Sequence, residues 1–179
     1  MISPPRNRLA AEDWLMAGFR ALARSGPTAL KAEALARDLG TTKGSFYWHF
    51  ADLPDYQARL IQLWEERAFD SVIAELDPAV APRTRLEQLC HAAVEFCGPS
   101  YGGAALEPAL RAWALVSPDV AKAVARMDAR RIAYLTCLCR EAGVENPQAP
   151  DALYALIVGL EILGLQNAQD TMLLLLNRL

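Results

Sequence analysis

The sequence predicts an all-α protein. Apolar residues recur at intervals of three and four along nearly the whole chain, the pattern of helices with one buried face. Strand-like alternation of apolar and polar residues is absent, and clusters of Gly and Pro separate the periodic segments. These observations predict nine helices and no sheet.

The first expected helix covers residues 10–24, where Leu15, Phe19 and Leu22 form one apolar stripe. Gly26 followed by a proline marks its end, because proline cannot continue the helix.

Two short helices are expected next, over residues 31–39 and 42–49, with Gly40 between them in the left-handed conformation. Thr42 is the expected N-cap of the second, with its hydroxyl accepting a hydrogen bond from the Ser45 amide. A short helix, a glycine turn and a short helix have the length and punctuation of a helix-turn-helix.

The rest of the chain reads as longer helices. Breaks rich in Pro and Gly place them at residues 52–76, 84–97, 104–115, 118–142, 150–167 and 170–178. Ser117 followed by a proline is a typical helix start, with a hydroxyl at the N-cap and proline in the first turn.

Charge is distributed unevenly. The 179 residues carry a net charge of −3, but residues 1–50 hold seven Lys/Arg and four Asp/Glu (+3), whereas residues 51–179 hold eleven and seventeen (−6). A basic N-terminal segment on an acidic body favours an anionic partner for the N-terminus.

The composition favours a soluble protein that needs no cofactor or metal. No signal-peptide pattern and no apolar run long enough to span a bilayer is present, so we expect a cytoplasmic protein without a membrane partner. The cysteines lie in apolar helical segments without metal-binding spacing, which indicates buried free thiols. They are Cys90, Cys97, Cys137 and Cys139.

The stretch LARDLGTTKGSFYWHF, residues 35–50, resembles the DNA-binding signature of the tetracycline-repressor (TetR) family of bacterial regulators. The matching positions are Leu35, Ala36, Leu39, Gly40, Thr42, Phe46, Tyr47, His49 and Phe50. The resemblance implies an N-terminal three-helix DNA-binding domain, residues 1–51, and a C-terminal helical domain, residues 52–179, with a small-molecule pocket and a dimer interface. The expected function is that of a homodimeric repressor on a palindromic double-stranded DNA operator, released by a small hydrophobic effector.

Two positions depart from the family pattern. Leu53 stands where family members usually carry a phosphate-binding lysine, and Lys31 stands where many carry a threonine. One phosphate contact is therefore expected to be lost and another gained.

In the segment that resembles the family's recognition helix, Phe46 and Phe50 are four residues apart and are expected to anchor it to the core. Lys43 can reach a guanine edge or a phosphate, and Tyr47 and His49 are expected to bind phosphates. The full set of expected DNA contacts is Lys31, Thr41, Thr42, Lys43, Gly44, Ser45, Tyr47, Trp48 and His49.

The C-terminal helices supply candidates for an effector pocket and a subunit interface. Aromatic and histidine residues that could line the pocket implied by the resemblance, or be plain core, are Trp64, His91, Phe96, Tyr101, Trp113 and Tyr134. The segment 150–167 is apolar nearly all round, with Glu161 as its lone central charge, which favours a subunit interface over a central monomer helix. The expected interface stripe is Leu153, Leu156, Ile157, Leu160 and Leu163.

Two alternatives remain open. The chain could be a DNA-binding regulator without a small-molecule effector. It could also be a metal-dependent helical enzyme that uses Glu87, His91 and Glu95, which share one helical stripe. That stripe is also the ordinary polar face of an amphipathic helix, and no second cluster completes a site, so a non-enzymatic function is favoured. Arg126, Asp128, Arg130 and Arg131 are expected to form ion pairs on their long helix.

Overall fold

A computed structural model describes residues 9–74, 76–95, 102–165 and 167–179. All regular elements within these ranges are helical, which confirms the predicted all-α class. They are α1 (Ala11–Ser25), η1 (Pro27–Ala29), α2 (Ala32–Asp38), α3 (Lys43–Tyr47), α4 (Leu53–Ala74), α5 (Pro82–Glu95), η3 (Gly103–Ala105), α6 (Leu106–Ala114), α7 (Pro118–Glu141), α8 (Ala149–Leu163) and α9 (Ala168–Leu176). None of the helices in these ranges combines the length and apolar character needed to cross a membrane.

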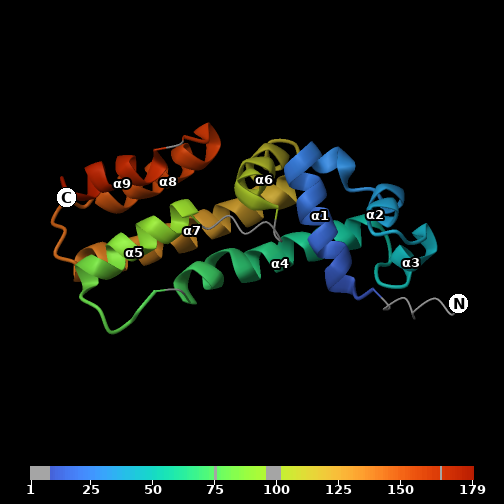
Figure 1. Cartoon of the computed structure of the whole chain (residues 1–179), viewed down its shortest axis with the longest axis horizontal. Coiled ribbons are helices and arrows are strands. Elements are labelled where there is room, and N and C mark those ends of the chain that lie inside the picture. Colours follow the sequence, from blue (N-terminus) through green and yellow to red (C-terminus); the bar gives the residue numbers. More distant parts are fainter. Residues whose placement is uncertain (1–8, 75, 96–101, 166) are drawn as a thin grey trace, which may run out of the picture.

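The molecule is elongated, with α1, α2 and α3 at one end and α8 and α9 towards the other (Figure 1). Buried apolar side chains form two clusters. The first joins α1 to α4 with α6 and the beginning of α7, and the second joins α5, the end of α7, α8 and α9. Because the first cluster includes residues on both sides of position 51, packing continues across the expected domain boundary, which stays a prediction.

Aromatic rings fill the centre of the three-helix end. Trp14 and Phe46 pack edge-to-face with ring centroids 5.4 Å apart, and Phe46 lies 5.0 Å from Phe50 and 5.2 Å from Tyr56. Both phenylalanines are almost fully buried, as the four-residue spacing predicts. These contacts fix α3 against α1 and α4.

The turn between α2 and α3 has the hydrogen bonds of a Schellman motif. The Thr41 amide donates to the Ala36 carbonyl oxygen (2.9 Å) and the Gly40 amide to the Arg37 carbonyl oxygen (3.2 Å). Gly40 has φ of +64°, the left-handed conformation that glycine adopts without strain. The predicted role of Gly40 is therefore confirmed.

The predicted side-chain cap of α3 is wrong, although Thr42 is the N-cap residue. The Thr42 side chain makes no capping hydrogen bond; the Ser45 amide donates to the main-chain carbonyl oxygen of Thr42 (3.0 Å). A backbone turn thus satisfies the donor assigned to the hydroxyl. The helix is also shorter than expected, ending at Tyr47 rather than at residue 49.

The start of α4 is capped reciprocally. The Asp55 amide donates to the Asp52 carboxylate (2.8 Å), and the Ala51 amide donates to the Asp55 carboxylate (3.0 Å). These two hydrogen bonds satisfy backbone amides at the beginning of α4.

The cysteine expectation holds in part. Cys90 and Cys139 are buried free thiols, Cys137 is half-buried, and Cys97 lies outside the described residues.

Candidate nucleic-acid interface

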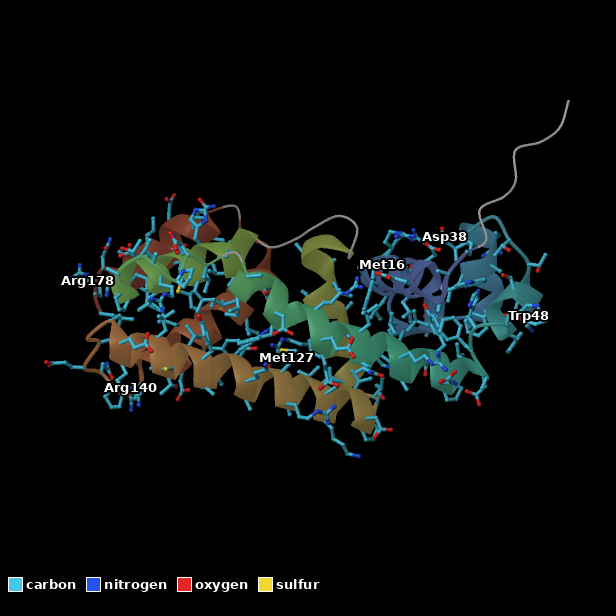
Figure 2. The ribbon with its side chains drawn as sticks, turned by 90° about the horizontal axis from the view of Figure 1, so that it is seen from below. Met16, Asp38, Trp48, Met127, Arg140 and Arg178 are labelled. Atoms are coloured by element: carbon cyan, nitrogen blue, oxygen red, sulfur yellow. The ribbon has the colours of Figure 1, made fainter. Side chains whose placement is uncertain are left out.

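The outer face of α3 carries exposed side chains of the types that bind DNA. Phe46 points into the core, whereas Lys43 is exposed and Tyr47 and Trp48 are 49% and 80% exposed. Trp48 lies at the tip of the three-helix end, far from Arg178 at the other end of the molecule (Figure 2). Exposed aromatic rings beside a cation suit sugar, base and phosphate contacts better than a core.

The other expected contacts surround this face. Thr42 and Gly44 are exposed, and Thr41, Ser45 and His49 are half-buried. Gly44 has open space where a side chain would project, with only the Thr42 hydroxyl oxygen within 4 Å of a Cβ built there. The backbone of α3 can therefore approach another surface closely.

Lys31 is exposed at the N-cap position of α2, one residue before the helix begins. A cation at that place lies beside helix amides that can also bind a phosphate. The structure thus leaves Lys31 available to DNA, and the predicted phosphate contact stays a prediction.

Glu33 was not among the expected site residues, yet it touches one of them. Its carboxylate lies 2.5 Å from the ammonium nitrogen of Lys43, and that nitrogen lies 5.9 Å from the centre of the Tyr47 ring. No motif pointed to Glu33, because contact between the first turns of α2 and α3 depends on the angle of the turn between them.

Leu53 is half-buried and packs against the first cluster. Arg59, one and a half turns further along α4, stacks over the Phe50 ring (5.6 Å to its centre) and pairs with Asp55 (3.0 Å). The beginning of α4 therefore contributes packing at the position where the family usually has a lysine.

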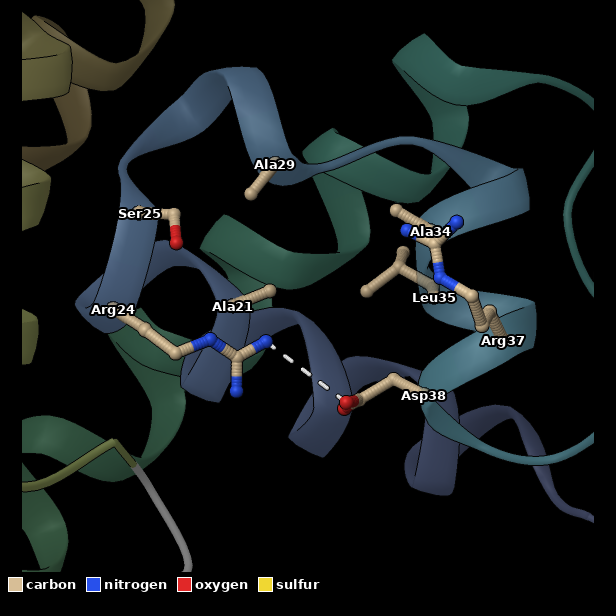
Figure 3. A pocket seen from close by; sticks show the side chains of 8 residues that line it. All are labelled: Ala21, Arg24, Ser25, Ala29, Ala34, Leu35, Arg37 and Asp38. Carbon is tan, nitrogen blue, oxygen red and sulfur yellow. Dashed lines mark ion pairs between the residues drawn. The ribbon is translucent and has the colours of Figure 1, made fainter.

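A pocket of about 520 Å³ opens on the three-helix end, between the end of α1, η1 and α2 (Figure 3). Its lining residues are Ala21, Arg24, Ser25, Ala29, Ala34, Leu35, Arg37 and Asp38. Arg24 and Asp38 form a long ion pair of 3.9 Å across it. None of the expected effector residues lines this pocket.

The expected effector residues do not converge in the described part of the chain. Trp64 and Trp113 are buried in the first cluster, Tyr134 packs edge-to-face on Phe69 beside the second, and His91 is exposed on α5. Phe96 and Tyr101 lie outside the described residues.

A network of ion pairs instead links the C-terminal helices. Arg111 of α6 makes two hydrogen bonds to the Asp128 carboxylate of α7 (2.8 and 3.0 Å), and the Tyr154 hydroxyl of α8 donates to the same carboxylate (2.6 Å). Burial raises the pKa of Asp128, but the hydrogen bonds from Arg111 and Tyr154 outweigh it, so the pKa is lowered.

A second pair lies beside the first. Arg131 makes two hydrogen bonds to the Glu107 carboxylate (2.7 and 3.3 Å), which also accepts one from the Trp64 indole nitrogen (3.1 Å). Arg131 and Glu107 are each less than one-fifth exposed. Arg126 and Arg130 pair with Glu65 and Asp70 of α4. Arg126, Asp128, Arg130 and Arg131 thus pair with residues of α4 and α6 rather than with one another.

Glu161 of α8 borders this network. Burial and the nearby Glu107 carboxylate raise the pKa of Glu161 to about 7. Within the described ranges it takes part in none of the ion pairs. The network therefore holds two arginines and three carboxylates, one negative charge in excess when Glu161 is ionised.

The expected interface stripe of α8 divides between two environments. Leu153, Ile157 and Leu160 are buried in the second cluster of one chain, Leu156 is half-buried, and Leu163 is 68% exposed. The exposed apolar side chains on and between α8 and α9 are Ile162, Leu163, Leu165, Leu173 and Leu174.

The described residues of α5 do not support the alternative of a metal-dependent enzyme. Glu87 pairs with Arg83 (3.2 Å), His91 is exposed, and the Glu95 side chain lies outside the described part. No group of three metal-ligating side chains occurs in the described ranges.

Comparison with known protein families also points to a DNA-binding helix-turn-helix at the N-terminal end. Residues 15–52 match the family model for bacterial regulatory proteins of the tetR family. None of the curated proteins compared with the chain matches it by sequence.

Solved structures share the fold along nearly the whole chain. A transcriptional regulator from Rhodococcus sp. Rha1 has 15% identity and a TM-score of 0.79, with 95% of each chain covered. A TetR-like transcriptional regulator from Rhodococcus sp. RHA1 has 17% identity and a TM-score of 0.77, with 98% of this chain and 97% of its own covered.

A third structure holds a small molecule. It is a candidate transcriptional regulator from Saccharomonospora viridis in complex with choline, with 21% identity, a TM-score of 0.77 and 94% of this chain and 93% of its own covered. The helix-turn-helix segment, residues 15–52, thus matches the tetR family model, and the fold of the chain is that of solved structures described as TetR-like transcriptional regulators.

Proposed function

We propose that the protein is a homodimeric transcriptional repressor that binds a palindromic operator through α3 and is released by a small-molecule effector. The observation that carries this proposal is the division of α3 into two faces. Phe46 is fully buried, while Lys43, Tyr47 and Trp48 are exposed, and Trp48 lies at the tip of the molecule (Figure 2). A short helix held by an aromatic core and lined outside with donors suits the major groove.

Selection from random-sequence DNA tests the DNA-binding part. Tyr47→Ala and His49→Ala should weaken binding to all duplexes by a similar factor, because phosphate contacts carry little sequence information. Lys43→Ala should change the preference at one base position. Arg178→Ala at the opposite end is the control and should change neither. Failure to enrich any sequence would contradict the proposal.

The dimer is proposed to form through the exposed apolar surface of α8 and α9. Side chains such as Leu163 and Leu174, 68% and 64% exposed, would lose water contact against a second copy. A two-fold pair would place two α3 helices in half-sites one DNA turn apart, about 34–36 Å.

Sedimentation tests the dimer. Leu163→Glu combined with Leu174→Glu should give monomers, because the interface would bury two charges. Leu115→Glu is the control, since Leu115 is 87% exposed at the C-cap of α6, outside the proposed interface. Monomeric wild-type protein, or equal effects of both changes, would contradict the proposed interface.

The effector is proposed to bind among α4, α6, α7 and α8, beside the ion-pair network. The similar regulator in complex with choline supports a ligand with a positively charged nitrogen, for which Glu161 offers the excess carboxylate. Choline and its uncharged isostere 3,3-dimethylbutanol are suitable probes. Choline should raise the melting temperature of wild type but not of Glu161→Gln, and the isostere should raise neither. Stabilisation by neither probe in any variant would favour a regulator without such an effector.

A further inference from the structure

The ion pair between Glu33 and Lys43 lies within the proposed DNA-binding face. Glu33 is in the first turn of α2 and Lys43 is the first residue of α3. Their charged atoms are 2.5 Å apart, and both side chains are at least half exposed (61% and 51%). The pair therefore faces the same solvent that a DNA duplex would displace.

Both partners are ionised at neutral pH. The hydrogen bond between them lowers the pKa of Glu33 and raises the pKa of Lys43. The pair has no net charge, so Lys43 in this state adds little to the attraction between the protein and the phosphate backbone.

Phosphate attraction depends on unpaired cations. Each lysine that neutralises a phosphate releases condensed counterions and adds about 0.9 to the slope of log affinity against log salt concentration. A lysine held by a carboxylate releases fewer counterions. Its ammonium group has three N–H donors, so it can keep one hydrogen bond to the carboxylate and still donate to a guanine edge.

We propose that Glu33 is a specificity-determining residue that holds Lys43 for base contact and suppresses its binding to phosphates on unrelated DNA. The inference rests on the proposed entry of α3 into the major groove. Without Glu33, the ammonium group of Lys43 would be unpaired and could bind phosphates in any DNA sequence. The affinity for random-sequence DNA would then rise more than the affinity for the operator.

The experiment compares wild type and Glu33→Gln on two duplexes of equal length. One carries the site enriched by random-sequence selection, and the other has a scrambled sequence. Fluorescence anisotropy between about 50 and 200 mM salt gives the affinity and its salt slope. For Glu33→Gln, scrambled-duplex affinity should rise about three- to ten-fold and the slope should steepen by about 0.9 per subunit. Affinity for the enriched site should rise less than two-fold.

Asp38→Asn is the matched control, because it removes the same charge from the same helix. Asp38 is 3.9 Å from Arg24 at the other end of α2. It should leave the ratio of the two affinities unchanged. In a Lys43→Ala background, Glu33→Gln should have no further effect.

Equal effects of Glu33→Gln and Asp38→Asn would overturn the inference, since they would indicate general charge repulsion. An effect that persists in the Lys43→Ala background would overturn it too. A wild-type protein that binds no DNA would overturn the proposed function and this inference together, whereas DNA binding unaffected by Glu33→Gln would overturn this inference alone. Circular dichroism checks that each variant remains folded.

Discussion

The hydroxyl of Tyr56 donates a hydrogen bond of 2.9 Å to the main-chain carbonyl oxygen of Trp14 and thereby joins α4 to α1. The residues are 42 positions apart, and both are fully buried. This contact lies at the centre of the aromatic core that anchors α3. It connects the long helix of the C-terminal part directly to the three-helix end.

Tyr56→Phe should lower the free energy of unfolding by about 1 kcal/mol, the usual net contribution of a buried hydrogen bond. Urea denaturation measures the change. Tyr134→Phe is the comparison, because Tyr134 is only half-buried and packs near the other cluster. Equal losses in the two variants would mean that the Tyr56 hydroxyl has no special role.

Gly18 permits the close approach of α4 to α1. A Cβ built on Gly18 would lie 1.9 Å from the Tyr56 hydroxyl oxygen and 3.2 Å from a methyl carbon of Leu60. Gly18→Ala should therefore cost about 1–3 kcal/mol through overpacking, despite the better helix propensity of alanine.

The matched control for Gly18→Ala is Gly159→Ala, another glycine within a helix. A Cβ on Gly159 would meet no atom within 4 Å, so alanine should stabilise α8 by up to about 1 kcal/mol. Thermal and urea denaturation of both variants measure the difference. If Gly18→Ala stabilised the protein, α4 would have to move away from α1 without loss of unfolding free energy, which would contradict the prediction.

Arg131→Met should destabilise the protein by about 3–5 kcal/mol, because it leaves the Glu107 carboxylate, which is less than one-fifth exposed, without its cation. Adding Glu107→Gln should recover much of the loss. Arg130→Met, at the neighbouring position, breaks an exposed pair with Asp70 and should cost about 1 kcal/mol or less. Similar losses of unfolding free energy in Arg130→Met and Arg131→Met would contradict the prediction that the less exposed ion pair contributes more to stability.

Glu161 should make stability depend on pH. Because its folded-state pKa is raised from 4.5 to about 7, the folded state binds the proton more tightly than the unfolded state. The contribution of protonated Glu161 to the free energy of unfolding is therefore fully present below about pH 4.5 and is lost as pH rises through 7. The total change is on the order of 3 kcal/mol.

Glu161→Gln should remove this dependence. The difference in unfolding free energy between the variant and wild type, measured from pH 4.5 to 8, should grow in favour of the variant. A constant difference across this range would show that the pKa of Glu161 is not raised in the folded state. Using the difference cancels carboxylates with lowered pKa values, such as Asp128, whose contributions have the opposite sign.

Leu53→Lys should add a cation that can bind a phosphate at the beginning of α4. Affinity for all duplexes should rise, and the salt slope should steepen by about 0.9 per subunit. Because Leu53 packs against the first cluster, some stability should be lost. An unchanged salt slope would show that position 53 does not face a phosphate in this protein.

Local sequence patterns predict the helices, the helix-turn-helix and the two faces of α3. These features depend on local rules: apolar periodicity, the left-handed conformation of Gly40 and the four-residue spacing of Phe46 and Phe50. The same rules could not distinguish a hydroxyl cap from a backbone turn at Thr42, because both satisfy the same amide.

Contacts between residues that are far apart in sequence depend on how the helices pack and could not be predicted from these patterns. Leu153 and Ile157 are buried within one chain. Trp64 lies in the first cluster, whereas Tyr134 packs against the second. Glu107 and Arg131, on different helices, form an ion pair. The carboxylate of Glu33 likewise lies against Lys43. Periodicity shows that a helix has an apolar face but not what covers it, because that depends on the angles at which helices cross.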